Sequence, residues 1–211
     1  MNVVINSGRE KSLLRRHPWI FASAIKSVDS EPASGGTVDL LSSDGHFLAR
    51  ASYSPISQIR ARVWTFNDEP VDKDFFRKRI RAAIDMRYSI FDKSDSMRLI
   101  HAESDGIPGL IVDRYADVLV LQSLTAGSEF WKETIADILV EETGIKNIYE
   151  RSDADVRELE GLKPITGVLR GAIKDLRLTI DEYGLKFKVD IEHGHKTGFY
   201  LDQRHNRHRV G

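Results

Sequence analysis

The sequence IRARVWTF, residues 59–66, decides the first part of the fold because its side chains alternate with a period of two. One set consists of Ile59, Ala61, Val63 and Thr65, and the other set consists of Arg60, Arg62, Trp64 and Phe66. Such alternation is typical of a β-strand that has one packed face. We therefore predict a strand here, with two arginines on the face that points away from the core.

Before this strand, short runs of strand-forming residues occur at 3–5, 37–41 and 47–53. Turn-forming residues at 34–36 and 43–45 separate the runs, and an amphipathic helix is predicted at about 9–16. Several short strands joined by turns favour a small barrel or sandwich. The stretch 67–71, which contains Pro70, marks the predicted end of this unit.

Beyond residue 71 the chain alternates between helical and strand patterns. The predicted helices lie at 72–87 and 128–143, and the predicted strands lie at 97–102, 109–114, 118–124 and 145–150. Gly144 occupies the favoured position after the second helix. A β-hairpin is predicted at 176–191 with its turn near Tyr183 and Gly184, and Asp202 is a good N-cap for a last helix. This order predicts an α/β or α+β unit.

Composition narrows the class of protein. With 211 residues, of which 41% are hydrophobic, the chain can bury a core and does not resemble a disordered protein. The net charge of -1 argues against a uniformly basic nucleic-acid-binding surface but allows a local basic face. The chain has no cysteine, which excludes a disulfide framework and a cysteine nucleophile within it. No apolar run approaches the roughly 20 residues that span a bilayer, and the start lacks a signal-peptide core, so we predict a cytoplasmic protein with no membrane partner.

A first candidate binding patch lies in the predicted helix at 9–16. Lys11 and Arg15 are four residues apart and share one side of the helix. Arg16 and His17 lie near its end, where cations complement the helix dipole. The pattern is consistent with a phosphate-binding patch and with a solvated helix face, and the residues alone favour the solvated face.

Aromatic residues accompany the arginines in two places. Trp19 and Phe21, which follow the basic helix, are predicted to return the chain to the core. Arg60 and Arg62, with Arg50 on a nearby strand, could form a nucleic-acid platform. An exposed sheet face without function is at least as consistent with the same pattern.

Other charged clusters carry less information. The acid-rich stretch 129–160 could coordinate a metal, but a solvated surface is favoured. The tail contains His193, His195, His205 and His208, yet no thiolate or suitably spaced carboxylate accompanies them, so no metal site is predicted. No Ser-His-Asp spacing, Walker-type loop or Gly-x-Gly cofactor turn is present, and no catalytic residue is predicted.

Five ordered segments, however, resemble one family. They are GREKSLLRRHPWIF (8–21), SPISQIRARVWTF (54–66), ESDGIPGLIVDRY (103–115), YERSD (149–153) and HGHKTGFYLDQRHNR (193–207). Together they resemble the PUA-domain-containing large-subunit (23S) rRNA cytosine-C5 methyltransferases, which depend on S-adenosylmethionine (SAM). The resemblance implies an α+β chain: a PUA pseudo-barrel at 1–70, a central α/β domain with a terminal β-hairpin at 71–191, and the start of a Rossmann-like SAM-binding domain at 192–211. The body of that C-terminal methyltransferase domain is absent from this chain.

The resemblance also implies roles for individual residues. The RNA-binding residues would be Lys11, Arg15, Arg16 and His17, with Arg60 and Arg62 as weaker candidates. The segment that flanks the cofactor pocket would contribute Lys196, Thr197, Gly198, Phe199, Tyr200, Asp202, Gln203 and Arg204. The implied partner is ribosomal RNA. The implied cofactor is SAM in the full-length enzyme, with none expected on this fragment.

The chain departs from the family in its catalytic parts. Methylation at carbon-5 in this family resembles covalent catalysis by a cysteine thiolate, and this chain has no cysteine. We therefore expect RNA recognition without catalysis, from a piece of a longer enzyme. A non-catalytic PUA-type RNA-binding or ribosome-associated adaptor is the alternative, and the reading frame beyond Gly211 would separate the two. A weaker third hypothesis is that the central domain binds protein.

Two expectations concern contacts outside the chain. The tail at 196–211 is expected to be mobile or to borrow contacts from a neighbour, because its partner domain is missing. The oligomeric state is left open, with a homodimer as one option.

Overall fold

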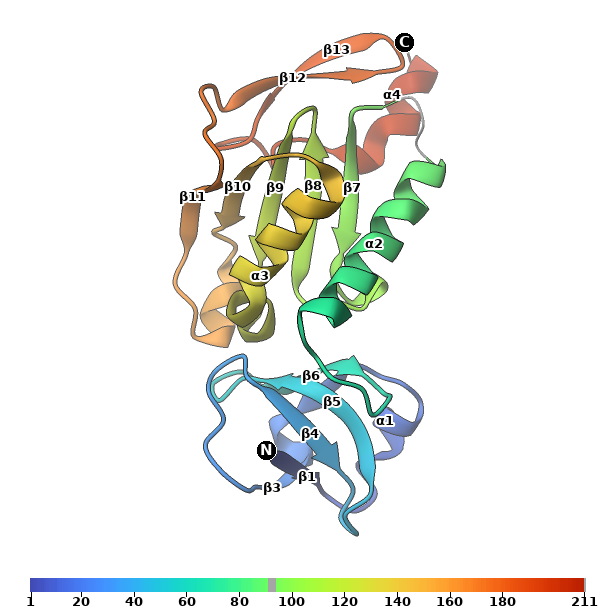
Figure 1. Ribbon diagram of the computed structural model, residues 1–211, viewed down its shortest axis with the longest axis vertical. Coiled ribbons are helices and arrows are strands. Elements are labelled where there is room, and N and C mark those ends of the chain that lie inside the picture. Colours follow the sequence, from blue (N-terminus) through green and yellow to red (C-terminus); the bar gives the residue numbers. More distant parts are fainter. Residues whose placement is uncertain (91–93, 211) are drawn as a thin grey trace.

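The computed structural model describes residues 1–90 and 94–210, and over these residues the fold is α+β, as predicted. Two sheets follow each other along the long axis of the molecule, and a hairpin lies at the end opposite the N-terminal sheet (Figure 1). We call the first sheet with helix α1 the N-terminal lobe (residues 2–66). The second sheet with helices α2 and α3 is the central lobe (residues 73–170).

The described part of the N-terminal lobe contains a six-stranded sheet in the order β2-β6-β5-β4-β1-β3. Its strands are β1 (Asn2–Ile5), β2 (Trp19–Phe21), β3 (Ile25–Val28), β4 (Thr37–Leu41), β5 (Phe47–Tyr53) and β6 (Ile59–Thr65). Neighbouring strands are antiparallel, apart from the parallel pair of β1 and β4. The bounds predicted for β4 and β5 are confirmed. The sequence pattern did not predict β2 or β3, which span only three and four residues.

Helix α1 is shorter than predicted and spans only Lys11–Leu14. The chain leaves the helix at Arg15 and turns at Arg16, whose φ of 60° lies in the left-handed region. A residue other than glycine adopts this conformation only where its surroundings hold it there. The prediction of a helix at 9–16 is therefore wrong at both ends, and the basic residues lie on a single turn and the loop after it.

Strand β6 is packed on both faces, so the prediction of one packed face is wrong. Ala61 and Val63 belong to the core of the N-terminal lobe. On the other face, Trp64 is 2% exposed and packs edge-on against Phe76 of the central lobe, with 5.2 Å between ring centroids. Arg62 on that face is buried as well. The face that the sequence left to solvent is covered by the second lobe.

The described part of the central lobe contains a five-stranded sheet in the order β11-β10-β9-β8-β7. Its strands are β7 (Ser96–His101), β8 (Leu110–Tyr115), β9 (Val118–Ser123), β10 (Asn147–Ser152) and β11 (Ile165–Arg170). Only the pair of β9 and β10 is parallel among these described neighbours. Strand β11 is missing from the sequence prediction because both of its faces are largely exposed and its sequence shows no apolar alternation.

Helices α2 (Lys73–Ile90) and α3 (Ala126–Thr143) cover one face of this sheet (Figure 1). Thr125 and Ser128 form a reciprocal capping box at the start of α3. Gly144, with a φ of 71°, ends the helix in the left-handed conformation that the sequence predicted. Among the described residues, no helix is long and apolar enough to cross a membrane.

The predicted hairpin is confirmed as strands β12 (Arg177–Glu182) and β13 (Leu185–Asp190). Tyr183 and Gly184, with φ values of 55° and 84°, form the two-residue turn. The hairpin covers the other face of the central sheet, where Ile180 and Val189 share a core cluster with Tyr115 and Val120. The central sheet is thus packed on both faces.

The described residues also form four short 3-10 helices: η1 (Ala22–Ala24), η2 (Ala102–Asp105), η3 (Asp155–Glu160) and η4 (Leu201–Gln203). The last helix is α4 (Arg204–Val210), which follows η4 directly. Asp202 therefore lies inside a 3-10 turn, and its prediction as the N-cap of the last helix is wrong. The segment 193–210, called the tail, runs beside strand β7 and the hairpin (Figure 1).

Candidate functional site

The exposed basic residues of the N-terminal lobe gather at α1 and the loop after it. Lys11, Arg15, Arg16 and His17 are all exposed. Within residues 1–90 and 94–210, Lys11, Arg15 and Arg16 form no ion pair with an acidic side chain. The Arg16 guanidinium lies over the ring of Phe66, 5.3 Å from its centroid, which fixes where the charge sits. The sequence-predicted patch therefore exists as an exposed, uncompensated cationic surface.

A groove of about 360 Å³ opens beside this patch, along strand β2. Arg9, Lys11, Trp19 and Phe21 are among its lining residues. Trp19 is 36% exposed and Phe21 is 48% exposed, so the prediction that both return to the core is wrong. Strand β2 is an edge strand, and only Ile20 between them is buried.

The two weaker RNA candidates, Arg60 and Arg62, lie elsewhere. Arg60 is half-buried and donates to the carbonyl oxygens of Ser54 and Pro55. Arg62 is 7% exposed, and its Nη2 donates to Glu160 Oε1 at 2.9 Å. A buried, paired arginine is not available to a phosphate, so the expectation for Arg62 is corrected to a role in joining the lobes.

The acid-rich stretch, residues 129–160, is also less solvated than predicted. Glu160 is 2% exposed, and its second oxygen accepts from the backbone N–H of Ala126 at the start of α3. Lys132 donates to Glu129 and Glu150 at 2.7 and 3.0 Å. These carboxylates stabilise the interior of the molecule. In the described part of the chain, no group of three or more histidine, aspartate or glutamate side chains is arranged to hold a metal.

The second candidate site lies where the tail meets the central sheet. Thr197 is fully buried, and its hydroxyl donates to Asp113 Oδ2 at 2.5 Å and lies 2.8 Å from the hydroxyl of Tyr115. Asp113, also fully buried, accepts two further hydrogen bonds from Nε and Nη2 of Arg98 at 2.8 and 2.9 Å. These four side chains tie the tail to β7 and β8.

The electrostatics of this network follow from burial and pairing. The hydrogen bonds that Arg98 donates to Asp113 raise the pKa of the Arg98 guanidinium, so it stays charged. Burial, and then the nearby charge of Asp113, raise the pKa of the Tyr115 hydroxyl well above its usual value. Tyr115 is therefore a neutral hydrogen-bonding group at any physiological pH.

Two glycines allow the tail to approach the end of the hairpin closely. A Cβ on Gly194 would collide with the carbonyl oxygen of Asp190 and lie 2.6 Å from the carbonyl oxygen of Gly198. Gly198 has a φ of 137°, a conformation that L side chains rarely adopt. A Cβ on Gly198 would lie 2.9 Å from the Val189 side chain and 3.1 Å from the carbonyl oxygen of Asp190.

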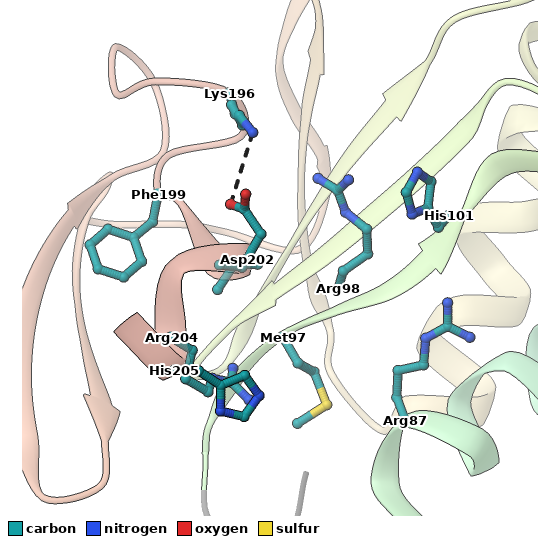
Figure 2. A pocket seen from close by; sticks show the side chains of 10 residues that line it. Arg87, Met97, Arg98, His101, Lys196, Phe199, Asp202, Arg204 and His205 are labelled. Atoms are coloured by element: carbon teal, nitrogen blue, oxygen red, sulfur yellow. Dashed lines mark ion pairs between the residues drawn. The ribbon is translucent and has the colours of Figure 1, made fainter. Parts of the chain in front are cut away.

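A pocket of about 440 Å³ lies between the tail, strand β7 and the end of α2. It is lined by four residues of the predicted cofactor segment, Lys196, Phe199, Asp202 and Arg204, together with Arg87, Met97, Arg98, His101, Leu201 and His205. Figure 2 shows Arg98 and His101 on β7 and Lys196 and Asp202 on the tail around the opening; the Lys196 Nζ is 3.9 Å from an Asp202 oxygen. Thr197, Gly198, Tyr200 and Gln203 are not part of its lining.

The described part of the tail makes contacts within its own chain, while its mobility stays a prediction. Arg207 donates to both oxygens of the buried Glu182 at 2.6 and 2.8 Å and lies 4.3 Å from the ring centroid of Phe199. Arg204 Nη2 donates to the carbonyl oxygen of Ser96. These contacts come from the same chain; Gly211 lies outside the described residues.

Sequence reasoning did not assign a role to Asp113, Tyr115 or Arg98. The sequence did hold a partial indication of their role, because Asp113 and Tyr115 lie at the end of the segment ESDGIPGLIVDRY. A charged residue inside an apolar strand indicates a partner, since an unpaired buried charge is costly. The identity of that partner, 84 residues away at Thr197, is a property of the folded chain.

Comparisons with known proteins place these features in context. Residues 3–66 match the family model of the PUA-like domain, so the predicted PUA-like N-terminal fold is confirmed. A "Ribosomal RNA large subunit methyltransferase I" from Shewanella amazonensis is 48% identical over 214 residues, covering 100% of this chain and 54% of the relative. The protein with the same description from Vibrio campbellii is 51% identical over 210 residues, covering 99% and 53%. The chain thus spans about half the length of the curated relatives it matches.

Two solved structures share the fold across the whole chain. One, from Streptococcus mutans, is described as a SAM-dependent methyltransferase; it superposes with a TM-score of 0.80 at 19% identity and covers 100% of this chain and 54% of its own. The other is described as a methyltransferase complexed with SAH, with a TM-score of 0.81 at 19% identity, and the match covers 100% of this chain and 53% of its own. At 19% identity the likeness shows that the fold is shared and says nothing about the chemistry of this chain.

Proposed function

We propose that this chain is the RNA-recognition part of a SAM-dependent rRNA large-subunit methyltransferase that modifies carbon-5 of cytosine. The observation that carries the proposal is the exposed cationic surface at Lys11, Arg15 and Arg16 on the PUA-like lobe. The names of the relatives that match the whole chain support the parent activity.

The cationic surface stands out because many arginines elsewhere in the described chain pair with carboxylates. Arg50 pairs with Asp39, Arg77 with Glu141, and Arg170 with Asp137. A cation already paired gains little from a phosphate, whereas an unpaired one releases counterions from RNA when it binds. Lys11, Arg15 and Arg16 would therefore supply the phosphate contacts that orient the protein on its RNA.

We further propose a separate role for each of three segments of the chain. Residues 1–70 would form the RNA-binding domain and residues 71–191 the central domain that carries the hairpin. Residues 192–211 would lead into the SAM-binding domain of the parent enzyme. The central domain would hold the tail through Asp113 and Glu182, so that a following domain starts from a fixed position.

The side chains at the pocket fit parts of SAM. Lys196 is half-exposed, and Nη1 of Arg98 has no hydrogen-bond partner among the described residues, so both are donors for a carboxylate. Asp202 is an acceptor for an amine or for ribose hydroxyls. Phe199 lines the pocket and can pack on an adenine, whereas Tyr200, which is 41% exposed outside the lining, can pack on a following domain. SAM supplies the methyl group when bound; these residues would form one wall of its site and hold its polar ends.

Catalysis would lie outside these 211 residues. The chain has no cysteine, the side chain expected to add to the cytosine ring in this family. The proposed role of this chain is recognition and positioning, with no transfer of its own.

The test is the binding of the whole chain to a fragment of large-subunit rRNA at increasing salt. The affinity should fall steeply with salt, and the double variant Arg15→Ala, Arg16→Ala should bind more weakly with a smaller salt slope. The matched control is Lys186→Ala, Lys188→Ala on the exposed face of the hairpin, which removes the same charge. Binding that ignores salt, or that responds equally to both double variants, would defeat the proposal.

A further inference from the structure

We propose that the groove beside strand β2 takes an unpaired nucleotide of single-stranded RNA, with its base against Trp19 and Phe21. The inference rests on the proposed function, because it names the class of RNA that the same lobe selects. It also goes further, since a phosphate-binding surface alone does not distinguish a paired strand from an unpaired one.

The two aromatic rings are the first support. Trp19 and Phe21 flank the buried Ile20 on an edge strand, and both line the groove of about 360 Å³. The register of β2 with β6 shifts between Ile20 and Phe21, yet both aromatic residues line the same groove. A base in the groove would therefore lie against both of them. A groove of this size with two exposed rings suits a base better than a phosphate alone.

The pose of Trp19 is set by contacts from both lobes. Its Nε1 donates to Glu103 Oε1 of the central lobe at 2.8 Å. The Arg62 guanidinium lies 5.5 Å from its ring centroid, and the His17 ring meets it edge-on at 5.9 Å. A ring held in place before binding loses little conformational freedom on binding, which favours a recognition role. The indole N–H is already satisfied, so the remaining exposed surface of the ring is the part available for stacking.

The charges of the groove identify a nucleic acid as the occupant. Arg9 and Lys11 line the groove, and neither has an ion pair among residues 1–90 and 94–210. Arg15 and Arg16 continue the cationic surface beyond it. Glu10, the acidic residue of this segment, is half-buried and does not line the groove. Cations beside exposed aromatic rings match a strand that presents phosphates and bases together.

The same geometry disfavours duplex RNA. In an A-form helix the flat faces of the bases are stacked on one another, and a side chain reaches only their edges and the 2′-hydroxyls. An aromatic ring can stack on a base only where the base is unpaired, as in a loop, a bulge or a single strand. The groove would therefore bind only unpaired RNA. The cationic surface beside it would bind the phosphates of paired and unpaired strands alike.

The experiment compares the whole chain on three RNA probes of equal length: a single strand, its duplex, and a hairpin with an unpaired loop. Trp19→Ala should bind the single strand about ten-fold or more weakly while its duplex affinity stays unchanged. Trp19→Phe, which keeps a ring, should retain most of the affinity. Phe130→Ala, which removes a 55% exposed aromatic on α3 outside the groove, is the matched control and should change nothing.

A second measurement does not depend on the alanine variant folding. Trp19 is the most exposed of the three tryptophans, with Trp64 at 2% and Trp131 partly buried. Single-stranded RNA should quench the fluorescence of the unmodified chain, and the quench should disappear in Trp19→Phe. Equal quench by duplex, or unchanged single-strand affinity in folded Trp19→Ala, would overturn the inference. If the unmodified chain shows no salt-dependent RNA binding, the proposed function is wrong, and the groove inference fails with it. If the groove binds a protein and no RNA, the inference about its occupant is wrong.

Discussion

Arg62 Nη2 of the N-terminal lobe lies 2.9 Å from Glu160 Oε1 of the central lobe, and the side chains are only 9% and 2% exposed. The second oxygen of Glu160 accepts from the first N–H of helix α3, and Arg62 also lies 3.6 Å from Glu103. Arg62 and Glu160 thus connect strand β6 with η3 and the start of helix α3, and the contact from Arg62 to Glu103 adds the η2 turn. These contacts help to fix the N-terminal lobe against the central lobe.

Removing one partner of this pair should be costly. Arg62→Ala leaves Glu160 as a buried, uncompensated carboxylate, so the free energy of unfolding should fall by about 3–5 kcal/mol. Urea denaturation measures this loss. Arg60→Ala, on the same strand, is the control; it removes hydrogen bonds to backbone carbonyls only and should cost about 1 kcal/mol. Equal losses in the two variants would contradict the role assigned to the Arg62–Glu160 pair.

The buried carboxylate of Asp113 should hold the tail in place. Asp113→Ala removes the acceptor for Arg98 and Thr197, and amides at 194–204 should exchange with deuterium faster while those of the N-terminal sheet stay protected. Asp117→Ala, an exposed carboxylate in the turn after β8, is the matched control. Uniform acceleration along the whole chain would mean global destabilisation and would argue against a local fastening of the tail.

Tyr115 should make stability fall at high pH. Its folded pKa is raised above the ordinary value of 10.0, so the folded state keeps the proton after the unfolded state has lost it. The contribution of protonated Tyr115 to the free energy of unfolding is fully present below about pH 10. Above that pH it declines by about 1.4 kcal/mol per pH unit. Tyr115→Phe should remove that part of the slope in denaturation curves taken across the window. A slope identical in both proteins would show that other groups account for the loss.

Gly127→Ala should destabilise the protein, although alanine normally stabilises a helix by about 0.5–1 kcal/mol over glycine. A Cβ at this position in α3 would lie 2.5 Å from the Ser52 side chain and 2.7 Å from the Trp64 ring. The N-terminal lobe would have to move away, at a cost of about 1–3 kcal/mol. Thermal unfolding gives the sign. A rise in melting temperature would mean that the lobes do not pack here as described.

Local patterns predicted the elements that depend on local interactions. Strands β4 and β5 have enough alternating residues to show their period, and their bounds match the prediction. The turn at Tyr183 and Gly184 and the end of α3 at Gly144 need positive φ, which the sequence signals through glycine. The resemblance at 193–207 singled out the tail, and four of its eight predicted cofactor residues line the pocket.

Only the tertiary structure decided which charged and aromatic residues are free. Arg62 and Trp64 are buried because a second lobe covers their face of β6, while Trp19 and Phe21 are exposed because β2 is an edge strand. Burial of this kind depends on surfaces that meet across long sequence separations, such as 98 residues between Arg62 and Glu160. Period and backbone preference were enough to indicate the longer strands, the two long helices and the glycine turns from the sequence. Which faces of the lobes cover each other, and therefore which side chains remain exposed, followed from packing and from the need to pair every buried charge.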